Sequence, residues 1–446
     1  MYRDKDLNVI KANINNIQDE AMKVFTENYK EPTNDEYSKV KKIILDFMNN
    51  KKRILYGGYA QHLFALKHGD VVYNEYLDRP DMEYYSPEPL KDMIELCNLL
   101  NEKGFKYVHG KEGVHKGTYK IFVNFDDYCD IGYMNKFLFD NCPTLQLECC
   151  KVAHPHFMLI DVYRVYTDPM TSYFRLKKSF DRNNLFIQYY PFNHKTDYNM
   201  SIYNLSKEVE KIKDYIRKEI IHTADKNKLI IIGTYAYNHL VKKQNEGYEL
   251  SFQSYQIISL DLLNDAKRIY KLLKDKFGNV EVTEYYPFYE YYDAHFEFSV
   301  NGNVVLKLYG NNKRCIVNYY SKNKNARYAS SQVTILYLLI DILYYAINKK
   351  MKEAQNSEYL VRTLFDIRDK YLEERNITVL DDSPFKEFII NCDGTPYDVL
   401  REDRLKQSEK KIKKFTYTPT GKEQKIPEYK FPNCSGNKVI KKPRLR

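Results

Sequence analysis

The sequence lacks tryptophan, and it contains no uninterrupted run of about 18 apolar residues. A run of that length is what a membrane-spanning helix needs, so we expect no membrane span. The first residues also lack the apolar core of a secretory signal peptide. With 43% hydrophobic residues and a mean hydropathy of −0.63, the 446-residue chain has enough apolar material for ordinary domain cores. We therefore expect a soluble protein of two or three domains.

The eight cysteines are scattered, and no Cys-x-x-Cys pair occurs among them. In a chain of this length we expect reduced intracellular thiols and no disulfide framework. A group of cysteines and histidines lies close together in the sequence: Cys142, Cys149, Cys150, His154 and His156. Their spacing matches no common zinc module, so we predict buried thiols at these positions and no metal site.

Tyrosine is abundant, with 43 residues in the chain. Together with many Lys, Asn and Ile residues, this composition is typical of an AT-rich coding sequence. Because such a bias places tyrosines without regard to function, we name no single tyrosine as a base-stacking residue.

Basic residues are concentrated at the end of the chain. The formal net charge is +10, and residues 401–446 carry fifteen Lys or Arg against five Asp or Glu. The surplus in this segment equals the net charge of the whole chain. A solvated tail or an import-like cluster would have the same composition, but a basic segment on a balanced body favours a polyanionic partner.

One arrangement of residues occurs twice, once with acids and once without. In both copies an apolar strand ends in a glycine turn and a helix, and further strands follow. The first copy contains Arg53–Tyr56, Gly57, Gly58, Tyr59–Lys67, Asp81–Tyr85 and Cys129–Ile131. The second contains Leu229–Ile232, Gly233, Thr234, Ser254–Ser259 and Leu306–Leu308. Aligning Ser86 with Ser259 puts Ser254 opposite Asp81 and Gln256 opposite Glu83. The later apolar strand of each copy puts Lys307 roughly opposite Asp130. Because one copy lost its acids while the apolar framework persists, we predict that the acids of the other copy take part in chemistry.

The acids of the first copy have the pattern of ligands for divalent cations. Asp81 and Glu83 are two residues apart on a predicted strand, so their side chains face the same way. Asp130 lies on a second apolar strand. Converging carboxylates repel one another unless cations lie between them, and hard ions such as Mg²⁺ or Mn²⁺ prefer oxygen ligands. We expect Asp126 and Asp127 in a hairpin turn, although either could take the place of Asp130.

Glycines and basic residues supply a candidate phosphate site. Gly57 and Gly58 stand at the start of a predicted helix, where backbone N–H groups without a Cβ can approach a triphosphate. Lys177, Lys178 and Arg182 can supply further positive charge. Each feature alone has an ordinary explanation as a turn or a solvated helix face, but their combination with the acids favours a nucleotide site.

These residues resemble the nucleotidyltransferase superfamily, whose fold is shared by DNA polymerase β and poly(A) polymerases. The superfamily pattern is a glycine pair, then Asp-x-Asp or Asp-x-Glu between apolar residues, and a later third acid. Three longer segments resemble the poly(A) polymerase catalytic subunits of large cytoplasmic DNA viruses of the poxvirus, asfarvirus and mimivirus-like groups: Tyr56–Ala60, Asp81–Pro87 and Asp161–Leu176. Those enzymes carry a second, degenerate nucleotidyltransferase domain, which is similar to the acid-free copy.

The resemblance implies an α+β fold with two tandem nucleotidyltransferase-like domains and helical additions. We expect the following domains: an N-terminal helical segment (1–50), a catalytic nucleotidyltransferase domain (51–200), a degenerate nucleotidyltransferase-like domain with C-terminal helices (201–385) and a basic, partly disordered tail (386–446).

The resemblance also implies template-independent addition of AMP from ATP to the 3′-hydroxyl of RNA, with two Mg²⁺ or Mn²⁺ ions. Asp81 and Glu83 would hold both ions, and Asp130 would bind the ion at the RNA 3′-hydroxyl. Gly57 and Gly58 would line the triphosphate of ATP. As partners we expect a single-stranded RNA 3′ end and either a second copy of the chain or a separate processivity subunit. The expected location is the cytoplasm of an infected cell, in a viral factory or virion.

Two other functions agree with the same residues. One is a different terminal nucleotidyltransferase, of the uridylyl or oligoadenylate type, because the acids do not select the base. The other is a non-catalytic RNA-binding subunit. The intact acids argue against the second alternative, because the other copy shows that they can be lost.

Overall fold

The computed structural model describes residues 2–148, 150–192, 198, 205–222, 228–244, 249–311, 313–396, 398–409, 413–420 and 424–428. The chain divides into two compact units. The first unit comprises Met1–Met134, Thr144–Ala153 and Val399–Lys430; the second comprises Asn135–Pro143, His154–Asp398 and Phe431–Arg446. In the described part of the chain, no helix is long and apolar enough to cross a membrane.

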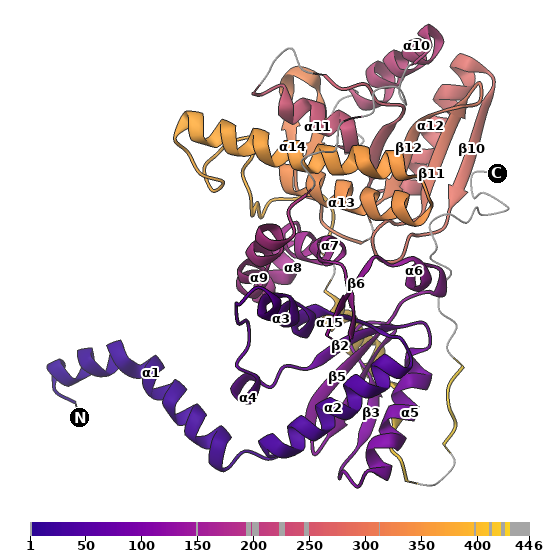
Figure 1. Cartoon of the computed structure of the whole chain (residues 1–446). Coiled ribbons are helices and arrows are strands. Elements are labelled where there is room, and N and C mark those ends of the chain that lie inside the picture. The colour runs from indigo at the N-terminus through magenta and orange to yellow at the C-terminus, as the bar shows by residue number, and fades with distance from the viewer. Residues whose placement is uncertain are drawn as a thin grey trace. The chain divides into compact units, whose positions relative to one another are not determined.

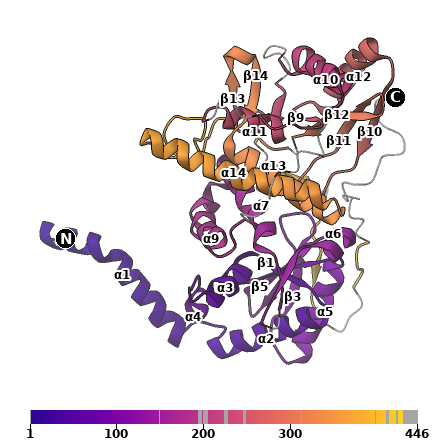
Figure 2. The same cartoon turned by 45° about the horizontal axis from the view of Figure 1, so that its top comes forward.

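Two helices precede the first sheet, as apolar residues at helical spacing predict. The first, α1 (Asp4–Asn28), extends away from the sheet of its unit (Figures 1 and 2). The second, α2 (Asn34–Asn50), begins where the Thr33 side chain accepts a hydrogen bond from the backbone N–H of Glu36, a standard helix cap. Its apolar face is buried against the unit, so α2 belongs to the core while α1 does not.

The first unit is built on an eight-stranded sheet with the strand order β15-β3-β4-β5-β2-β1-β7-β6. Its strands are β1 (Ile54–Tyr56), β2 (Met82–Ser86), β3 (His109–Glu112), β4 (Thr118–Val123), β5 (Asp126–Tyr133), β6 (Thr144–Leu147), β7 (Cys150–Ala153) and β15 (Thr416–Tyr417). Its helices after α2 are α3 (Gly57–Lys67), α4 (Glu75–Asp78), α5 (Pro89–Glu102) and α15 (Val399–Ser408). The central strand β2 runs parallel to β5 and antiparallel to β1. This pairing brings the glycine turn after β1 next to the acids of β2 and β5.

The second unit contains a seven-stranded sheet with the order β10-β11-β12-β9-β8-β14-β13. Its strands are β8 (Ile230–Ile232), β9 (Tyr255–Ser259), β10 (Val280–Tyr285), β11 (His295–Val300), β12 (Asn303–Gly310), β13 (Asn318–Ser321) and β14 (Ala326–Ala329). Replacing each strand by its counterpart in the first sheet reproduces the order β3-β4-β5-β2-β1-β7-β6. The duplication predicted from the sequence is therefore present in the topology of both sheets.

The remaining helices belong to the second unit: α6 (Lys136–Asn141), α7 (Pro155–Tyr166), α8 (Pro169–Ser172), α9 (Leu176–Tyr189), α10 (Lys207–Ile216), α11 (Gly233–Val241), α12 (Leu262–Phe277), α13 (Ser331–Ile347) and α14 (Met351–Arg375). The helix α13 is apolar almost all round, and it packs against α14, α7 and α11 (Figures 1 and 2). A helix buried on every side is the expected consequence of such a sequence.

Part of the predicted tail contributes to the first sheet. The two-residue strand β15 pairs with β3 at the edge of the sheet, and the hydroxyl of Tyr417 donates to the side chain of Asn98 at 2.7 Å. The basic end of the predicted tail, from Lys441 to Arg446, lies outside the described residues.

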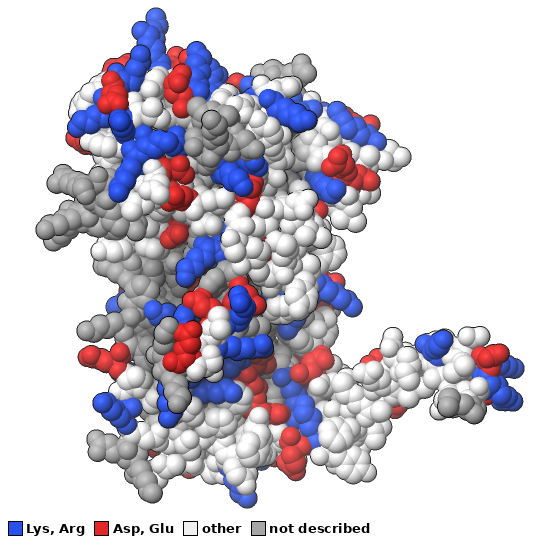
Figure 3. Space-filling view, turned by 180° about the vertical axis from the view of Figure 1, so that it is seen from behind, with Lys and Arg blue, Asp and Glu red and all other residues white. Residues whose placement is uncertain are grey.

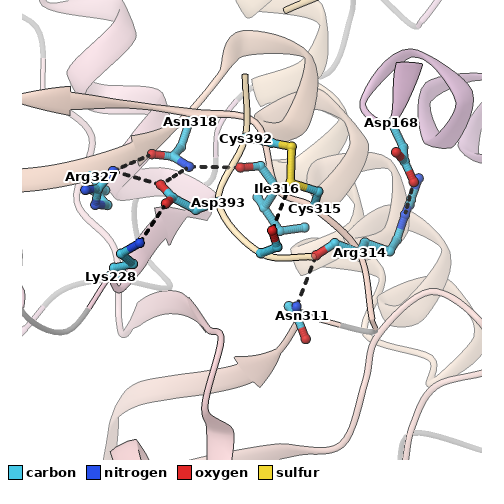
Figure 4. The surroundings of a disulfide bond; sticks show 11 residues. Asp168, Lys228, Asn311, Arg314, Cys315, Ile316, Asn318, Arg327, Cys392 and Asp393 are labelled. Atoms are coloured by element: carbon cyan, nitrogen blue, oxygen red, sulfur yellow. Dashed lines mark hydrogen bonds and ion pairs between the residues drawn. A yellow bond between two sulfur atoms is a disulfide. The ribbon is translucent and has the colours of Figure 1, made fainter. Parts of the chain in front are cut away.

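The prediction of reduced thiols is wrong for one cysteine pair. Cys315 and Cys392 form a disulfide in the second unit, whereas Cys97, Cys129, Cys142 and Cys150 are free and buried; Cys149 and Cys434 lie outside the described residues. Figure 4 shows the disulfide beside the paired backbones of Ile316 and Asp393. The Asp393 carboxylate also accepts hydrogen bonds from Arg327 at 2.8 Å and Asn318 at 3.1 Å. The bond thus reinforces a contact that side chains and backbone already make.

Candidate active site

The glycine turn between β1 and α3 is shaped around a glutamate of the neighbouring strand. Gly57 has a φ of +71°, and a Cβ at this position would lie 1.7 Å from Oε2 of Glu83. The backbone N–H of Gly58 donates to the same Oε2 at 2.7 Å. Glycine is therefore required twice over, by the left-handed backbone and by the close approach of a carboxylate.

The acids of the first copy come together through strand pairing. Glu83 lies opposite Asp130 in the parallel pair β2–β5, and Asp81 immediately precedes β2. Met82 and Tyr84 are fully buried, while Asp81 and Glu83 are half-buried. The alternation expected of a strand is thus confirmed, and it leaves the carboxylates on the face that solvent reaches.

A lysine that the sequence analysis missed lies among these acids. The Nζ atom of Lys120, on β4, is 2.6 Å from Oδ2 of Asp127 and 2.7 Å from Oδ1 of Asp130. The expected turn at Asp126 and Asp127 is wrong, because both residues begin β5 and the turn is made by the two residues before them. Lys120 consequently pairs with Asp130 across the β4–β5 ladder. Predicting this pair would have required both the turn at the two preceding residues and the register shift between Ile121 and Phe122.

The carboxylates of the site carry more negative charge than Lys120 balances. The pKa of Asp130 is raised to about 6, chiefly by burial and also by the charges of Asp127 and Asp81, against the opposing effect of Lys120. The pKa of Asp127 is also raised, chiefly by burial. For Lys120, burial lowers the pKa, but the hydrogen bonds to both aspartates outweigh it, so the lysine stays charged. An excess of partly buried carboxylates is the condition in which a divalent cation binds favourably.

The second copy repeats this geometry with different chemistry. Gly233 has a φ of +65°, and a Cβ there would lie 2.0 Å from Oε1 of Gln256. Gln256 pairs with Lys307 in the parallel pair β9–β12, as Glu83 pairs with Asp130 in β2–β5, so Lys307 takes the position of Asp130 that the later strand predicted roughly. Lys307 binds Glu297, its partner on β11, at 2.8 Å. The lysine–aspartate pair of the first sheet has become a glutamate–lysine pair with the charges exchanged.

In the second unit, buried side chains fill the position that corresponds to the acidic site of the first. The amide of Gln256 donates to Asp341 of α13 at 3.4 Å, and the hydroxyl of Tyr292 donates to the other oxygen of the same carboxylate. Asp341 and Tyr292 are both buried. The position that corresponds to the acidic site is therefore occupied by the protein's own side chains.

The present side-chain positions do not form a finished metal centre. No group of three or more His, Cys, Asp or Glu side chains is arranged to hold a metal ion in the part of the chain that the structure describes. The reason lies in the partners just named, since Glu83 is turned toward Gly58 and Asp130 toward Lys120. The donor set itself, three carboxylates on adjoining strands, suits a hard divalent cation.

The basic residues predicted for the phosphates belong to a different unit from the acids. Lys177, Lys178 and Arg182 are on α9, which belongs to the second unit, whereas the glycine turn and the acids belong to the first. Lys177 and Lys178 are exposed, and Arg182 is half-buried. The structure thus brings together the five predicted residues Gly57, Gly58, Asp81, Glu83 and Asp130 and places the three cations on a separate element.

Comparison with known proteins gives consistent matches along the whole chain. A family model described as "Poly(A) polymerase catalytic subunit" matches residues 42–172, and one described as "APMV, Putative poly(A) polymerase, catalytic subunit, C-terminal" matches residues 184–445. A mimivirus protein named "Putative poly(A) polymerase catalytic subunit" is 28% identical, over 98% of this chain and 83% of its own length. A protein of African swine fever virus with the same name is 35% identical, over 33% of this chain and 32% of its own length.

A solved structure agrees with these matches. The crystal structure of the Megavirus polyadenylate synthase has a TM-score of 0.91 to this chain at 29% sequence identity, covering 99% of this chain and 93% of the Megavirus chain. The tandem α+β fold predicted from the sequence is thereby confirmed.

Proposed function

Because the chain belongs to the poly(A) polymerase catalytic subunit family, we propose that it adds AMP from ATP to the 3′-hydroxyl of RNA without a template. The observation that supports catalysis in this chain is the contrast between its two sheets. The first keeps Asp81, Glu83 and Asp130 at the positions where the second has Ser254, Gln256 and Lys307. A subunit that only bound RNA would have no use for this difference.

The reaction makes one bond and breaks another at the α-phosphorus of ATP. The oxygen of the RNA 3′-hydroxyl attacks that phosphorus, the bond to the bridging oxygen of pyrophosphate breaks, and the hydroxyl proton is released. The RNA is then one adenylate longer. The protein has to orient the hydroxyl, hold the triphosphate and offset the charge that develops.

Asp81 and Glu83 would hold two Mg²⁺ or Mn²⁺ ions, and Asp130 would hold the ion nearer the RNA hydroxyl. Such ions lower the pKa of a bound hydroxyl and neutralise the leaving phosphates. Glu83 and Asp130 first have to turn away from Gly58 and Lys120, whose contacts they make here. Asp127 offers Lys120 a second carboxylate at 2.6 Å, so the lysine retains a partner when Asp130 changes its own.

The triphosphate would lie along the turn of Gly57 and Gly58. Release of Glu83 from the Gly58 N–H would free that donor for a phosphate oxygen. The same movement of Glu83 would thus prepare both the metal ligand and the phosphate site. Lys177, Lys178 and Arg182 remain the candidates for further phosphate contacts.

The partners proposed for the chain are ATP and single-stranded RNA, with a second copy of the chain or a separate processivity subunit as a further partner. We also propose a location in the cytoplasm of the infected cell, in a viral factory or virion; the viral source of the relatives supports it.

Extension of a 5′-labelled single-stranded RNA with each nucleoside triphosphate in turn, with Mg²⁺ or Mn²⁺, tests the proposal. We expect a ladder with ATP alone and none for the Asp81→Ala/Glu83→Ala variant. A ladder with UTP would instead assign a uridylyltransferase at the same site. No extension with any nucleotide, while RNA still binds, would refute the catalytic proposal, and activity retained by the double variant would refute the site.

A further inference from the structure

An aromatic strip lies exposed on the second unit, at the start of the basic helix α9. It consists of Tyr173, Phe174 and Phe180, whose exposed fractions are 72%, 62% and 49%. Tyr173 and Phe174 stand in the single 3₁₀ turn that joins α8 to α9, and their ring centroids are 5.6 Å apart at an angle of 84°. Such rings are normally buried, so three exposed ones within eight residues call for a partner.

The helix that follows Tyr173 and Phe174 is anchored in its unit. Asn183 and Phe186 of α9 are buried, and α9 packs against α7 of the same unit. The 3₁₀ turn with Tyr173 and Phe174 leads directly into this anchored helix, which itself carries Phe180.

Exposed basic residues follow these rings in the chain. Arg175, Lys177 and Lys178 are exposed, and the guanidinium carbon of Arg175 lies 5.4 Å from the ring centroid of Phe174. In the sequence from Tyr173 to Arg182, Asp181 is the one acid against four basic residues. On the face shown in Figure 3, Lys and Arg side chains lie interspersed with Asp and Glu side chains. The strip thus joins exposed rings to a local surplus of cations.

This combination fits single-stranded nucleic acid better than another protein. Aromatic rings offer faces on which unpaired bases stack, and neighbouring Lys and Arg contact the phosphates of the backbone. The centre of a protein–protein interface is instead depleted of lysine. A duplex has no free base faces for the rings, so the surface suits an unpaired strand.

We propose that the aromatic strip is a binding surface for single-stranded RNA, with bases stacked on Tyr173 and Phe174 and phosphates contacted by Arg175, Lys177 and Lys178. The inference rests on the proposed function, since it assigns a surface to the RNA substrate of that reaction. It gives Lys177 and Lys178 a role toward RNA phosphates, whereas the sequence pattern alone suggested the triphosphate of ATP.

The decisive variant is Tyr173→Ala/Phe174→Ala. Removal of two stacking platforms should weaken binding of a single-stranded RNA oligonucleotide by roughly tenfold or more, while the KM for ATP is unchanged. A matched control is Tyr107→Ala/Phe125→Ala, because this pair is also exposed and its ring centroids lie 4.7 Å apart in the first unit. The control should bind RNA like the parent protein.

Two measurements separate stacking from a loss of folding. An RNA containing 2-aminopurine should lose fluorescence when it binds the parent protein or the Tyr173→Phe variant, because the base stacks on a ring. It should keep its fluorescence when it binds the double alanine variant. The Lys177→Gln/Lys178→Gln variant should reduce the slope of log Kd against log salt by about 1.4, as expected for two lost phosphate contacts.

The outcomes distinguish this inference from the proposed function. If the parent protein extends RNA with ATP but Tyr173→Ala/Phe174→Ala binds RNA as tightly as the control, the strip is not an RNA surface. A variant that instead changes the sedimentation coefficient of the protein, with RNA affinity unchanged, would show a contact between copies of the chain and overturn the inference. A raised KM for ATP in the lysine variant, with an unchanged salt slope, would show that Lys177 and Lys178 contact the triphosphate of ATP and not the RNA phosphates.

Discussion

Substitution of the two equivalent glycines distinguishes an effect on the free energy of unfolding from an effect on the rate of catalysis. Gly57→Ala and Gly233→Ala each place a Cβ on a left-handed backbone, with φ values of +71° and +65°. For an L-residue that conformation costs roughly 1–2 kcal/mol. The new Cβ would also lie 1.7 Å from Glu83 in one case and 2.0 Å from Gln256 in the other, so the neighbouring side chain must move. The two variants should therefore lose similar free energy of unfolding.

Their effects on activity should differ greatly. Gly57→Ala puts a Cβ on the turn along which the triphosphate would lie, beside Glu83, and a misplacement of about 1 Å at a reacting group can reduce the rate about 100-fold. Gly233→Ala displaces an amide that has no catalytic partner. We would measure urea unfolding of both variants beside single-turnover extension of a labelled RNA. Equal activities of two equally stable variants would refute the assignment of the first copy as the active one.

Three further changes test particular contacts. Lys120→Met removes a cation that competes with metal for Asp130, so half-maximal extension should need less Mg²⁺; a greater need would contradict this interpretation. Burial raises the pKa of Asp341 to about 6, so its ionised form costs folding free energy as the pH rises through 6. Asp341→Asn should then be more stable than the parent at pH 8, by at most about 3 kcal/mol, and equally stable below pH 4, as urea titrations at both pH values would show. Cys315→Ser opens a loop of 77 residues closed by Cys392 and should lose about 4 kcal/mol in non-reducing buffer and nothing with excess thiol.

The duplication and the acidic site could be predicted because their signals are local in the sequence. An apolar strand followed by glycine, and acids alternating with apolar residues, specify a turn and a strand face without knowledge of the rest of the fold. Comparison of the later strands placed Lys307 roughly opposite Asp130, and the strand registers confirm that placement, because each residue pairs with the equivalent position of its neighbouring strand.

Features that depend on register or on distant contacts could not be predicted in the same way. The turn before Asp126 consists of Asn124, a common turn residue, and Phe125 at a φ of +70°, a residue type that gives no turn signal. An error of two residues there, together with the register shift between Ile121 and Phe122, hid the pairing of Lys120 with Asp130. The bond between Cys315 and Cys392 joins positions 77 residues apart, and only the tertiary fold brings them together.

The exchanged ion pair has an evolutionary consequence. Restoring an aspartate at position 307 alone would set two carboxylates face to face in a buried place, because Glu297 is the cross-strand neighbour. Restoring a lysine at position 297 alone would set two ammonium groups there. Each single step back is worse than either end state, so Lys307→Asp should destabilise the second copy without reviving it. The second copy can therefore regain its acidic site only by changing both residues together. Selection can adapt this copy to other roles more easily than it can restore catalysis there.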